Sequence, residues 1–132
     1  MKVLVIDNEP NLRTAIKALL QAFCPEIKTI EEADGVKSGL QKIKAFQPDI
    51  VLLDVEMDDG SGFDLMKQVV NPGFQLIFVT AHNKYAIEAF QFSAIDYLLK
   101  PVDPDALQIS IQKASVNIRN SNLQQQVQIL LQ

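Results

Sequence analysis

The alternation of short apolar runs with stretches of helical periodicity constrains the fold of this chain more than any other feature. The first run, Val3 to Ile6, is followed by apolar residues at helical spacing from Leu12 to Phe23. The cycle then recurs, with predicted strands at 28–32, 50–53, 76–80 and 95–99 and predicted helices near 36–46, at 62–70, through 85–90 and from 104 onward. Such repetition within 132 residues predicts one α/β domain, a parallel sheet with helices on both faces.

The polarity of each predicted strand indicates its place in the sheet. Central parallel strands are buried on both faces, and the runs Val3–Ile6, Ile50–Leu53 and Leu76–Val79 are uniformly apolar. The run Lys28–Glu32 is mixed and Ile95–Leu99 is short, so both are predicted edges. This pattern predicts a doubly wound, flavodoxin-like sheet of order 2-1-3-4-5, which binds ligands where the loops after strands one and three meet.

Acidic residues follow the two central strands that meet at this point. The first strand ends in Asp7, Asn8 and Glu9, and the third ends in Asp54 with Glu56 two residues on. Neighbouring carboxylates repel each other unless a cation neutralises them, and oxygen ligands with room for water suit Mg²⁺. The alternative is that the two aspartates only cap helices or end strands.

The fourth and fifth strands bring a hydroxyl and an ammonium group to the same edge. Thr80 ends the fourth strand and Lys100, followed by Pro101, ends the fifth. A carboxylate nucleophile, a divalent ion and donors for phosphoryl oxygens are the parts needed for phosphoryl transfer to an aspartate. The chain has no nucleotide-binding glycine motif, no CxxC pair and a single histidine, His82, which we expect on a surface loop. The run 58–62 is expected to be a mobile, solvated acidic loop with helix-capping residues.

Composition limits the surroundings in which this segment works. The 16 acidic residues outnumber the 12 basic ones, so the segment itself is not expected to bind nucleic acid. The apolar runs are far shorter than the roughly 18 to 20 residues that cross a bilayer, and Met1 leads into a strand rather than a signal peptide. The lone Cys24 is expected to be a buried apolar residue. We therefore expect no membrane contact and a cytoplasmic location.

The last part of the chain has a different character. Ile109, Val116, Leu123 and Leu130 recur every seven residues, with Val127 beside them. We expect residues 1–118 to form the domain and 119–132 to begin a linker helix toward a C-terminal effector outside this sequence. The alternative is a frayed tail, because a convincing coiled coil needs about three to four heptads.

Residues 1–118 resemble the receiver domain of bacterial two-component response regulators. Four motifs carry the resemblance, in order: VIDNEP at 5–10, LLDVEM at 52–57, VTA at 79–81 and DYLLKP at 96–101. The longer stretch 79–101 resembles receivers that precede LytTR-type DNA-binding domains. By this resemblance the chain is a signalling domain, not an enzyme, which takes a phosphoryl group from a sensor histidine kinase and switches a transcriptional output.

The resemblance also implies a role for each site residue. It makes Asp54 the phosphoacceptor, Thr80 and Lys100 the phosphoryl-binding residues, and Tyr97 the aromatic residue that turns inward as Thr80 moves. It implies a cis Lys100–Pro101 bond and a homodimer through the fourth helix, fifth strand and fifth helix. The implied Mg²⁺ ligands are Asp7, Asn8, Asp54 and the backbone carbonyl of Glu56, with Glu9 as an accessory acid.

Two departures from the family pattern leave rival hypotheses open. Asn8 stands where the family usually has a second acid, and Asp58-Asp59 stands where relatives often have Pro-Gly, which adds negative charge near the reaction. These departures favour slower phosphorylation, a higher Mg²⁺ requirement, or a receiver-like dimerisation module that works without phosphorylation. A Mg²⁺-dependent phosphatase or transferase is a further alternative, although the chain has no room for a substrate-covering domain.

Overall fold

Strands β1 (Lys2–Ile6) and β3 (Ile50–Leu53) form the centre of a parallel five-stranded sheet in the computed structural model, which describes residues 1–131. The sheet order is β2-β1-β3-β6-β7, with β2 at Thr29–Ala33, β6 at Gln75–Thr80 and β7 at Asp96–Leu99. Since β6 and β7 are the fourth and fifth strands of this sheet, the predicted order 2-1-3-4-5 is confirmed. The two predicted edge strands are the edges.

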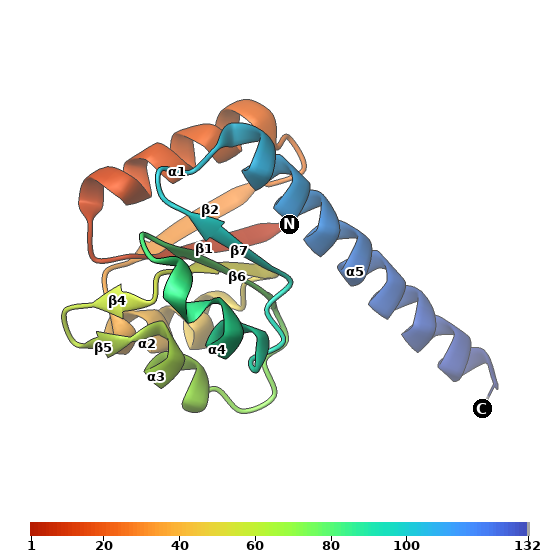
Figure 1. The fold of residues 1–132 in the computed structure, drawn as a ribbon. Helices are drawn as coiled ribbons and strands as arrows, with labels where there is room; N and C mark the ends of the chain where they lie inside the picture. The colour runs from red at the N-terminus through yellow and green to blue at the C-terminus, as the bar shows by residue number, and fades with distance from the viewer. Residues whose placement is uncertain (132) are drawn as a thin grey trace.

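Helices cover both faces of the sheet, as the alternating pattern predicts (Figure 1). Helices α1 (Pro10–Phe23) and α5 (Pro104–Leu131) pack on one face, against one cluster of buried residues. Helices α2 (Val36–Phe46), α3 (Gly62–Lys67) and α4 (Ala86–Phe90) pack on the other, against a second cluster. The sheet separates the two cores, so both faces of β1, β3 and β6 are buried. Cys24 lies in the first core, as expected.

The segment after β3 is more ordered than the sequence indicates. It forms an antiparallel hairpin of β4 (Glu56–Met57) and β5 (Gly60–Ser61), and Ser61 caps α3 by accepting a hydrogen bond from the Asp64 amide at 3.0 Å. Asp59 accepts hydrogen bonds from the amides of Val36 (2.7 Å) and Lys37 (3.1 Å) at the N-terminus of α2. The run is therefore a hydrogen-bonded hairpin and not a mobile loop, because it delivers this carboxylate to helix amides that have no partner in their own helix. Asp58 and Asp59 are exposed and Ser61 caps a helix, as expected.

Two helices on the second face are shorter than predicted. Helix α3 ends at Lys67 instead of continuing to Val70. Asn71, four residues later, has a positive φ of 54° and precedes Pro72, so the helix does not resume there. A residue before proline avoids the helical conformation, and asparagine tolerates the left-handed one. Helix α4 is preceded by a 3-10 turn, η1, at Asn83–Tyr85.

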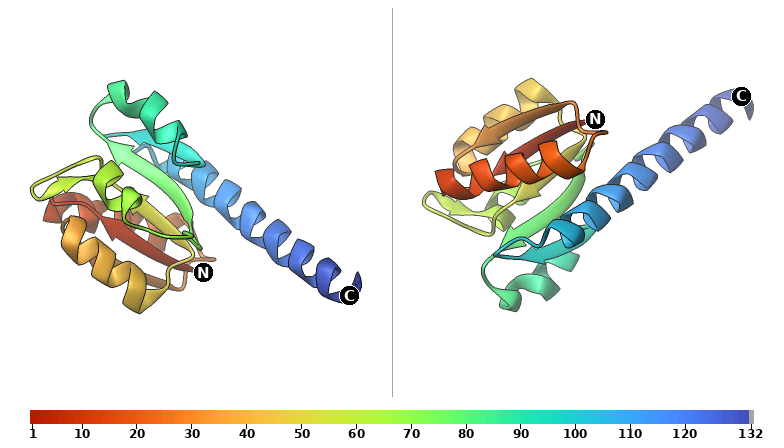
Figure 2. Two further views of the ribbon diagram at one scale, coloured as in Figure 1. Left: turned by 90° about the horizontal axis from the view of Figure 1, so that it is seen from below. Right: turned by 90° about the horizontal axis from the view of Figure 1, so that it is seen from above.

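Helix α5 extends well past the sheet, as both views in Figure 2 show. Its first half packs on the domain, and all side chains of residues 119–131 are exposed. Within the described residues 1–131, no helix combines the length and apolar character needed to cross a membrane.

Candidate functional site

Two aspartates lie side by side at the carboxyl end of the sheet. Ile6 and Leu53 are register partners, so Asp7 and Asp54 leave neighbouring strands at the same level. The Asp54 amide donates to the Ile6 carbonyl at 2.9 Å, and the Asp7 amide donates to the Ala33 carbonyl at 3.0 Å. Asp7 is 1% exposed and Asp54 is 3% exposed. The sheet therefore holds two carboxylates, nearly buried, at its switch point.

Lys100 joins this pair from the far edge strand. Its amide donates to the Thr80 carbonyl at 2.9 Å, and its peptide bond to Pro101 is cis. The Lys100 Nζ lies 3.0 Å from Asp7 Oδ2 and 3.4 Å from Asp54 Oδ2, with Glu9 Oε1 farther away at 3.7 Å. One ammonium group thus faces three acidic side chains, and the site keeps an excess of negative charge.

Burial changes the acidity of these groups. Burial, followed by the charge of Asp7, raises the pKa of Asp54 to about 6, although the Lys100 ammonium opposes the shift. Burial alone would lower the pKa of Lys100, but its contact with the Asp7 carboxylate and the charges of Asp54 and Asp7 raise it instead. The site therefore favours a charged lysine beside a carboxylate that is costly to ionise.

The donor set fits a cation that keeps water ligands. Asp7 Oδ1 accepts a hydrogen bond from the Glu9 amide at 2.9 Å, but the buried Asp7 Oδ2 makes no well-directed hydrogen bond despite its proximity to Lys100. Within residues 1–131 no three acidic, histidine or cysteine side chains are grouped to hold a metal. Asp7 and Asp54 could hold a divalent cation only with further oxygen ligands from carbonyl groups and water, which is the ligand set that Mg²⁺ prefers.

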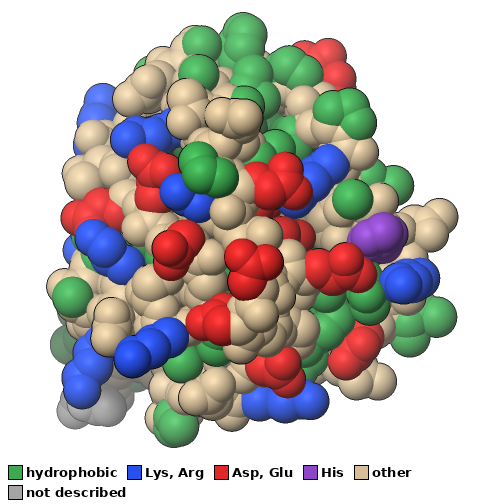
Figure 3. Space-filling view, turned by 90° about the vertical axis from the view of Figure 1, so that its left-hand side faces the viewer, with side chains coloured by type: hydrophobic (Ala, Val, Ile, Leu, Met, Phe, Trp, Pro, Cys, Tyr) green, Lys and Arg blue, Asp and Glu red, His purple; other side chains and the backbone are tan. Residues whose placement is uncertain are grey.

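An open pocket of about 400 Å³ lies above these carboxylates, with Asn8, Glu56, Thr80 and Lys100 in its lining. Figure 3 shows acidic side chains gathered across this face of the molecule. Asn8 Nδ2 donates a hydrogen bond to Asp58 Oδ1 at 3.4 Å, so the Asn8 side chain is turned toward the β4–β5 hairpin. Asp58 does place charge at the pocket, whereas Asp59 caps α2.

The loop after β6 closes one side of the pocket. Thr80 is buried, and its Oγ1 accepts a hydrogen bond from the His82 amide at 3.4 Å. The Tyr97 hydroxyl donates to the His82 carbonyl, and the His82 ring lies 3.3 Å from Glu56 Oε2. His82 is exposed, as expected, but it also connects this loop to the β4–β5 hairpin.

Some positioning residues have no clear signal in the sequence. The Gly62 amide donates to the Val55 carbonyl at 2.8 Å, and a Cβ at Gly62 would lie 2.4 Å from the Asp54 carbonyl oxygen. The Tyr85 hydroxyl donates to Glu56 Oε1, which lowers the pKa of Glu56. The helix-capping run around Ser61 is the one signal near Gly62, and it does not indicate a contact with Asp54.

Two curated bacterial proteins illustrate the similarity to known sequences. Sensory transduction protein LytT of Bacillus cereus is 38% identical over 116 residues, which cover 86% of this chain and 46% of that protein. Sensory transduction protein LytR of Staphylococcus haemolyticus is 36% identical over 125 residues, which cover 92% and 48%. The chain thus spans about half the length of the curated relatives it matches.

Solved structures show the same fold. The signal receiver domain of a LuxO repressor protein from Vibrio parahaemolyticus has a TM-score of 0.83 at 24% identity, and the match covers 92% of this chain and 95% of that one. Response regulator TrrA from Thermotoga maritima, solved in complex with Mg²⁺ and BeF, has a TM-score of 0.75 at 29% identity and coverage of 86% and 97%.

The sequence profile of the response regulator receiver domain matches residues 3–112. This span contains residues from all five strands of the main sheet and all the strand-end residues described above. Because the profile covers most of the chain, the protein belongs to the response regulator receiver domain family.

Proposed function

We propose that the chain accepts a phosphoryl group on Asp54 from a phosphohistidine of a sensor histidine kinase. An Asp54 oxygen attacks phosphorus, so a P–O bond forms as the P–N bond breaks, and the histidine leaves with the electron pair and takes a proton. The proposal rests on one observation: the buried Asp54 carboxylate lies at the switch point with Lys100 Nζ at 3.4 Å and Asp7 beside it.

The surrounding residues have distinct roles in this proposal. Asp7, Asp54, the Asn8 side chain and the Glu56 carbonyl would hold Mg²⁺, with Glu9 as an accessory acid. When bound, Mg²⁺ supplies positive charge that offsets the negative charge on the transferred group. Catalysis is then positioning and electrostatics.

Lys100 and Thr80 would receive the phosphoryl oxygens. The phosphoryl group carries roughly −1.5 to −2 charge, more than the carboxylate it replaces. Each charge-assisted hydrogen bond contributes about 1.5–3 kcal/mol, and about 5.5 kcal/mol moves a two-state equilibrium from 1:99 to 99:1. Two new bonds are therefore of the right size to drive a switch.

The loop after β6 would transmit the conformational change from the site to the surface. Tyr97 holds the His82 carbonyl, so a shift of Thr80 toward the phosphoryl group moves the loop to which Tyr97 is bound. The side chains beyond it are apolar and exposed, with Ile87 and Phe90 on α4. We propose that this α4–β7–α5 face changes its packing on phosphorylation and forms the homodimer.

The output would be a separate domain in the same protein. The curated relatives are about twice as long as this chain. In this proposal residues 1–118 are the receiver domain and 119–132 begin the linker to the output domain. We propose a cytoplasmic transcription regulator of the LytTR type, in which the output domain and not this segment binds DNA.

The test is intact-mass spectrometry after incubation with Mg²⁺ and acetyl phosphate. We expect one phosphoryl adduct, which is absent from Asp54→Asn and from samples with excess EDTA. Purified histidine kinase is the second donor in the same assay. A folded protein that takes no adduct from either donor would contradict the proposal. It would favour the second candidate function, a phosphorylation-independent dimerisation module, for which Asn8 is the supporting observation.

A further inference from the structure

Helix α5 carries apolar side chains on two opposite faces. Its inner face packs on the domain through Leu107, Ile111, Ala114 and Ile118. Its outer face carries apolar residues at intervals of seven: Ile109, Val116, Leu123 and Leu130. If the outer residues are placed at heptad position d, the inner ones fall at b and f, which lie on the opposite side of a helix with 3.6 residues per turn. The outer stripe therefore points directly away from the domain.

This stripe has the spacing of a helix that pairs with another helix. A strict seven-residue repeat favours a left-handed coiled-coil seam, whereas helices that pack on a globular surface follow a period of 3.6. The neighbouring a positions are Lys113, Asn120 and Val127. A single asparagine at an a position fixes register and a two-stranded state in parallel coiled coils. Lys113 is compatible with the seam, because its ammonium is paired with Asp96 at 3.2 Å.

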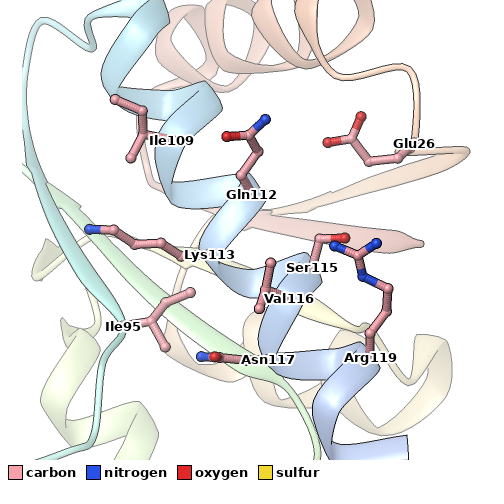
Figure 4. A pocket seen from close by; sticks show the side chains of 9 residues that line it. All are labelled: Glu26, Ile95, Ile109, Gln112, Lys113, Ser115, Val116, Asn117 and Arg119. Atoms are coloured by element: carbon pink, nitrogen blue, oxygen red, sulfur yellow. The ribbon is translucent and has the colours of Figure 1, made fainter. Parts of the chain in front are cut away.

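The surface along the stripe is hollowed where a partner helix would insert its side chains. A groove of about 830 Å³ is lined by Ile109, Lys113, Val116 and Asn117, among others, as Figure 4 shows. A second hollow of about 310 Å³ is lined by Leu123, Gln124, Val127 and Gln128. In coiled coils, the hole around a d residue is formed by residues at a, d and e. Both hollows contain such a set.

The outer half of α5 lacks any support from its own domain. Leu123 is 59% exposed and Leu130 is 84% exposed. The part after residue 118 continues for about 20 Å at 1.5 Å per residue, and isolated helices of this length are marginal in water. A partner helix along the stripe would therefore stabilise the part of α5 that follows residue 118.

The charge pattern indicates what that partner is. Arg119 is the only charged residue from 114 to 131, so a charged partner has almost nothing to recognise. A neutral apolar stripe is complementary to its own copy across a two-fold axis, where residue i meets residue i. In an identical pair the one like-charge contact would be between Lys113 and its own copy, and the Asp96 carboxylate at 3.2 Å offsets that charge.

We propose that two copies of this chain pair through α5 as a parallel, in-register coiled coil. Ile109, Val116, Leu123 and Leu130 form the d layers, and Asn120 faces its own copy. The pairing does not depend on phosphorylation of Asp54, and it is a separate contact from the α4–β7–α5 interface proposed above, which forms on phosphorylation. Ile129 and Leu131 lie outside the seam, and the pairing does not explain their exposure.

Sedimentation of the whole chain over a range of concentrations tests the pairing. We expect a dimer in the wild type and in Gln125→Glu, a change at position f, on the side of the helix opposite the stripe. Leu123→Glu places the same charge in the seam and is expected to weaken dimerisation at least tenfold, or by about 1.4 kcal/mol. Circular dichroism and the intact-mass assay show whether each variant keeps its fold.

Cysteine cross-linking tests the register. Leu123→Cys is expected to form a disulfide-linked dimer under mild oxidation, whereas Gln125→Cys and the wild type, whose Cys24 is buried, remain uncross-linked. A monomer at every concentration would overturn the proposal, because the stripe then serves another segment or protein. A dimer of the unphosphorylated protein that survives Leu123→Glu but is lost in Phe90→Glu would also overturn it, because the interface then lies on α4.

Discussion

Gly62 touches the backbone of Asp54 so closely that a Cβ on the glycine would lie 2.4 Å from the Asp54 carbonyl oxygen. The contact joins the start of α3 to the loop that presents the proposed phosphoacceptor. Since the opposing atom belongs to the backbone, it cannot turn aside as a flexible side chain would. The orientation of Asp54 therefore depends on the absence of a side chain at this position.

We predict that Gly62→Ala destabilises the protein and reduces phosphoryl uptake. Extra atoms forced into a packed site cost about 1–3 kcal/mol, and the displaced loop would misplace the Asp54 carboxylate. Urea unfolding measures the loss of stability, and intact mass after treatment with acetyl phosphate measures phosphoryl uptake. Gly73→Ala is the matched control, because a Cβ there would meet no atom within 4 Å. Equal behaviour of the two variants would contradict the role of Gly62.

Lys100→Met is predicted to lower the stability of the metal-free protein by about 3 kcal/mol, because it leaves buried carboxylates without their ammonium partner. Added Mg²⁺ should recover part of this loss. Chemical unfolding with and without Mg²⁺ measures both effects. Lys42→Met removes an exposed lysine that pairs with Glu31 at 2.8 Å, and it should change stability by less than about 1 kcal/mol. A Lys100 variant as stable as this control would show that the buried pair needs no cation.

The raised pKa of Asp54, about 6, predicts a pH-dependent difference between wild type and Asp54→Asn. Between the unfolded value of about 3.9 and the folded value, the folded state binds more protons, so stability falls as pH rises. Asparagine has no charge to bury, so in EDTA the variant should be more stable than the wild type above pH 6, by at most about 3 kcal/mol.

Thermal unfolding of both proteins in EDTA, at about pH 5 and about pH 7.5, measures this difference. The gap should widen toward the higher pH and shrink when Mg²⁺ replaces EDTA. A gap that stays constant with pH would mean that Asp54 ionises as it does in the unfolded chain.

Asn8→Asp is predicted to strengthen Mg²⁺ binding about tenfold, because it adds a carboxylate beside Asp7 where the wild type has a neutral amide. The stabilisation of the folded state by Mg²⁺ follows the ratio of free ion to dissociation constant, so a thermal titration reports the change. Asn11→Asp adds the same charge on the exposed face of α1 and should leave the midpoint unchanged. An unchanged midpoint in the Asn8 variant would exclude this side chain from the metal site.

Several features of the site follow from local sequence. Uniformly apolar runs identified β1, β3 and β6 as central strands, and parallel strands necessarily bring the residues that follow them to one edge. Asp7, Asp54, Thr80 and Lys100 are found at that edge. Each of these predictions needed only the residues within one strand and the rule that such strands run in parallel.

Contacts between segments that are far apart in the sequence could not be predicted from it. The 58–62 run was interpreted as a mobile loop because its residues are polar, yet Asp59 caps α2 by accepting a hydrogen bond from the amide of Lys37, 22 residues earlier in the chain. Likewise, nothing next to Gly62 in the sequence indicates that the Asp54 carbonyl lies against it. Polarity describes what a residue can bind, but not which partner the fold brings to it.

The sequence by itself therefore determined the strand order, the edge at which the site lies and the residue types gathered there, because these depend on short-range periodicity and burial. Only the tertiary structure decided that Lys100 lies between two buried carboxylates, that Tyr97 and Glu56 both bind the loop at His82, and that one stripe of α5 faces away from the domain. These relationships depend on how elements pack in three dimensions, where a few ångströms decide between an ion pair and two separate charges.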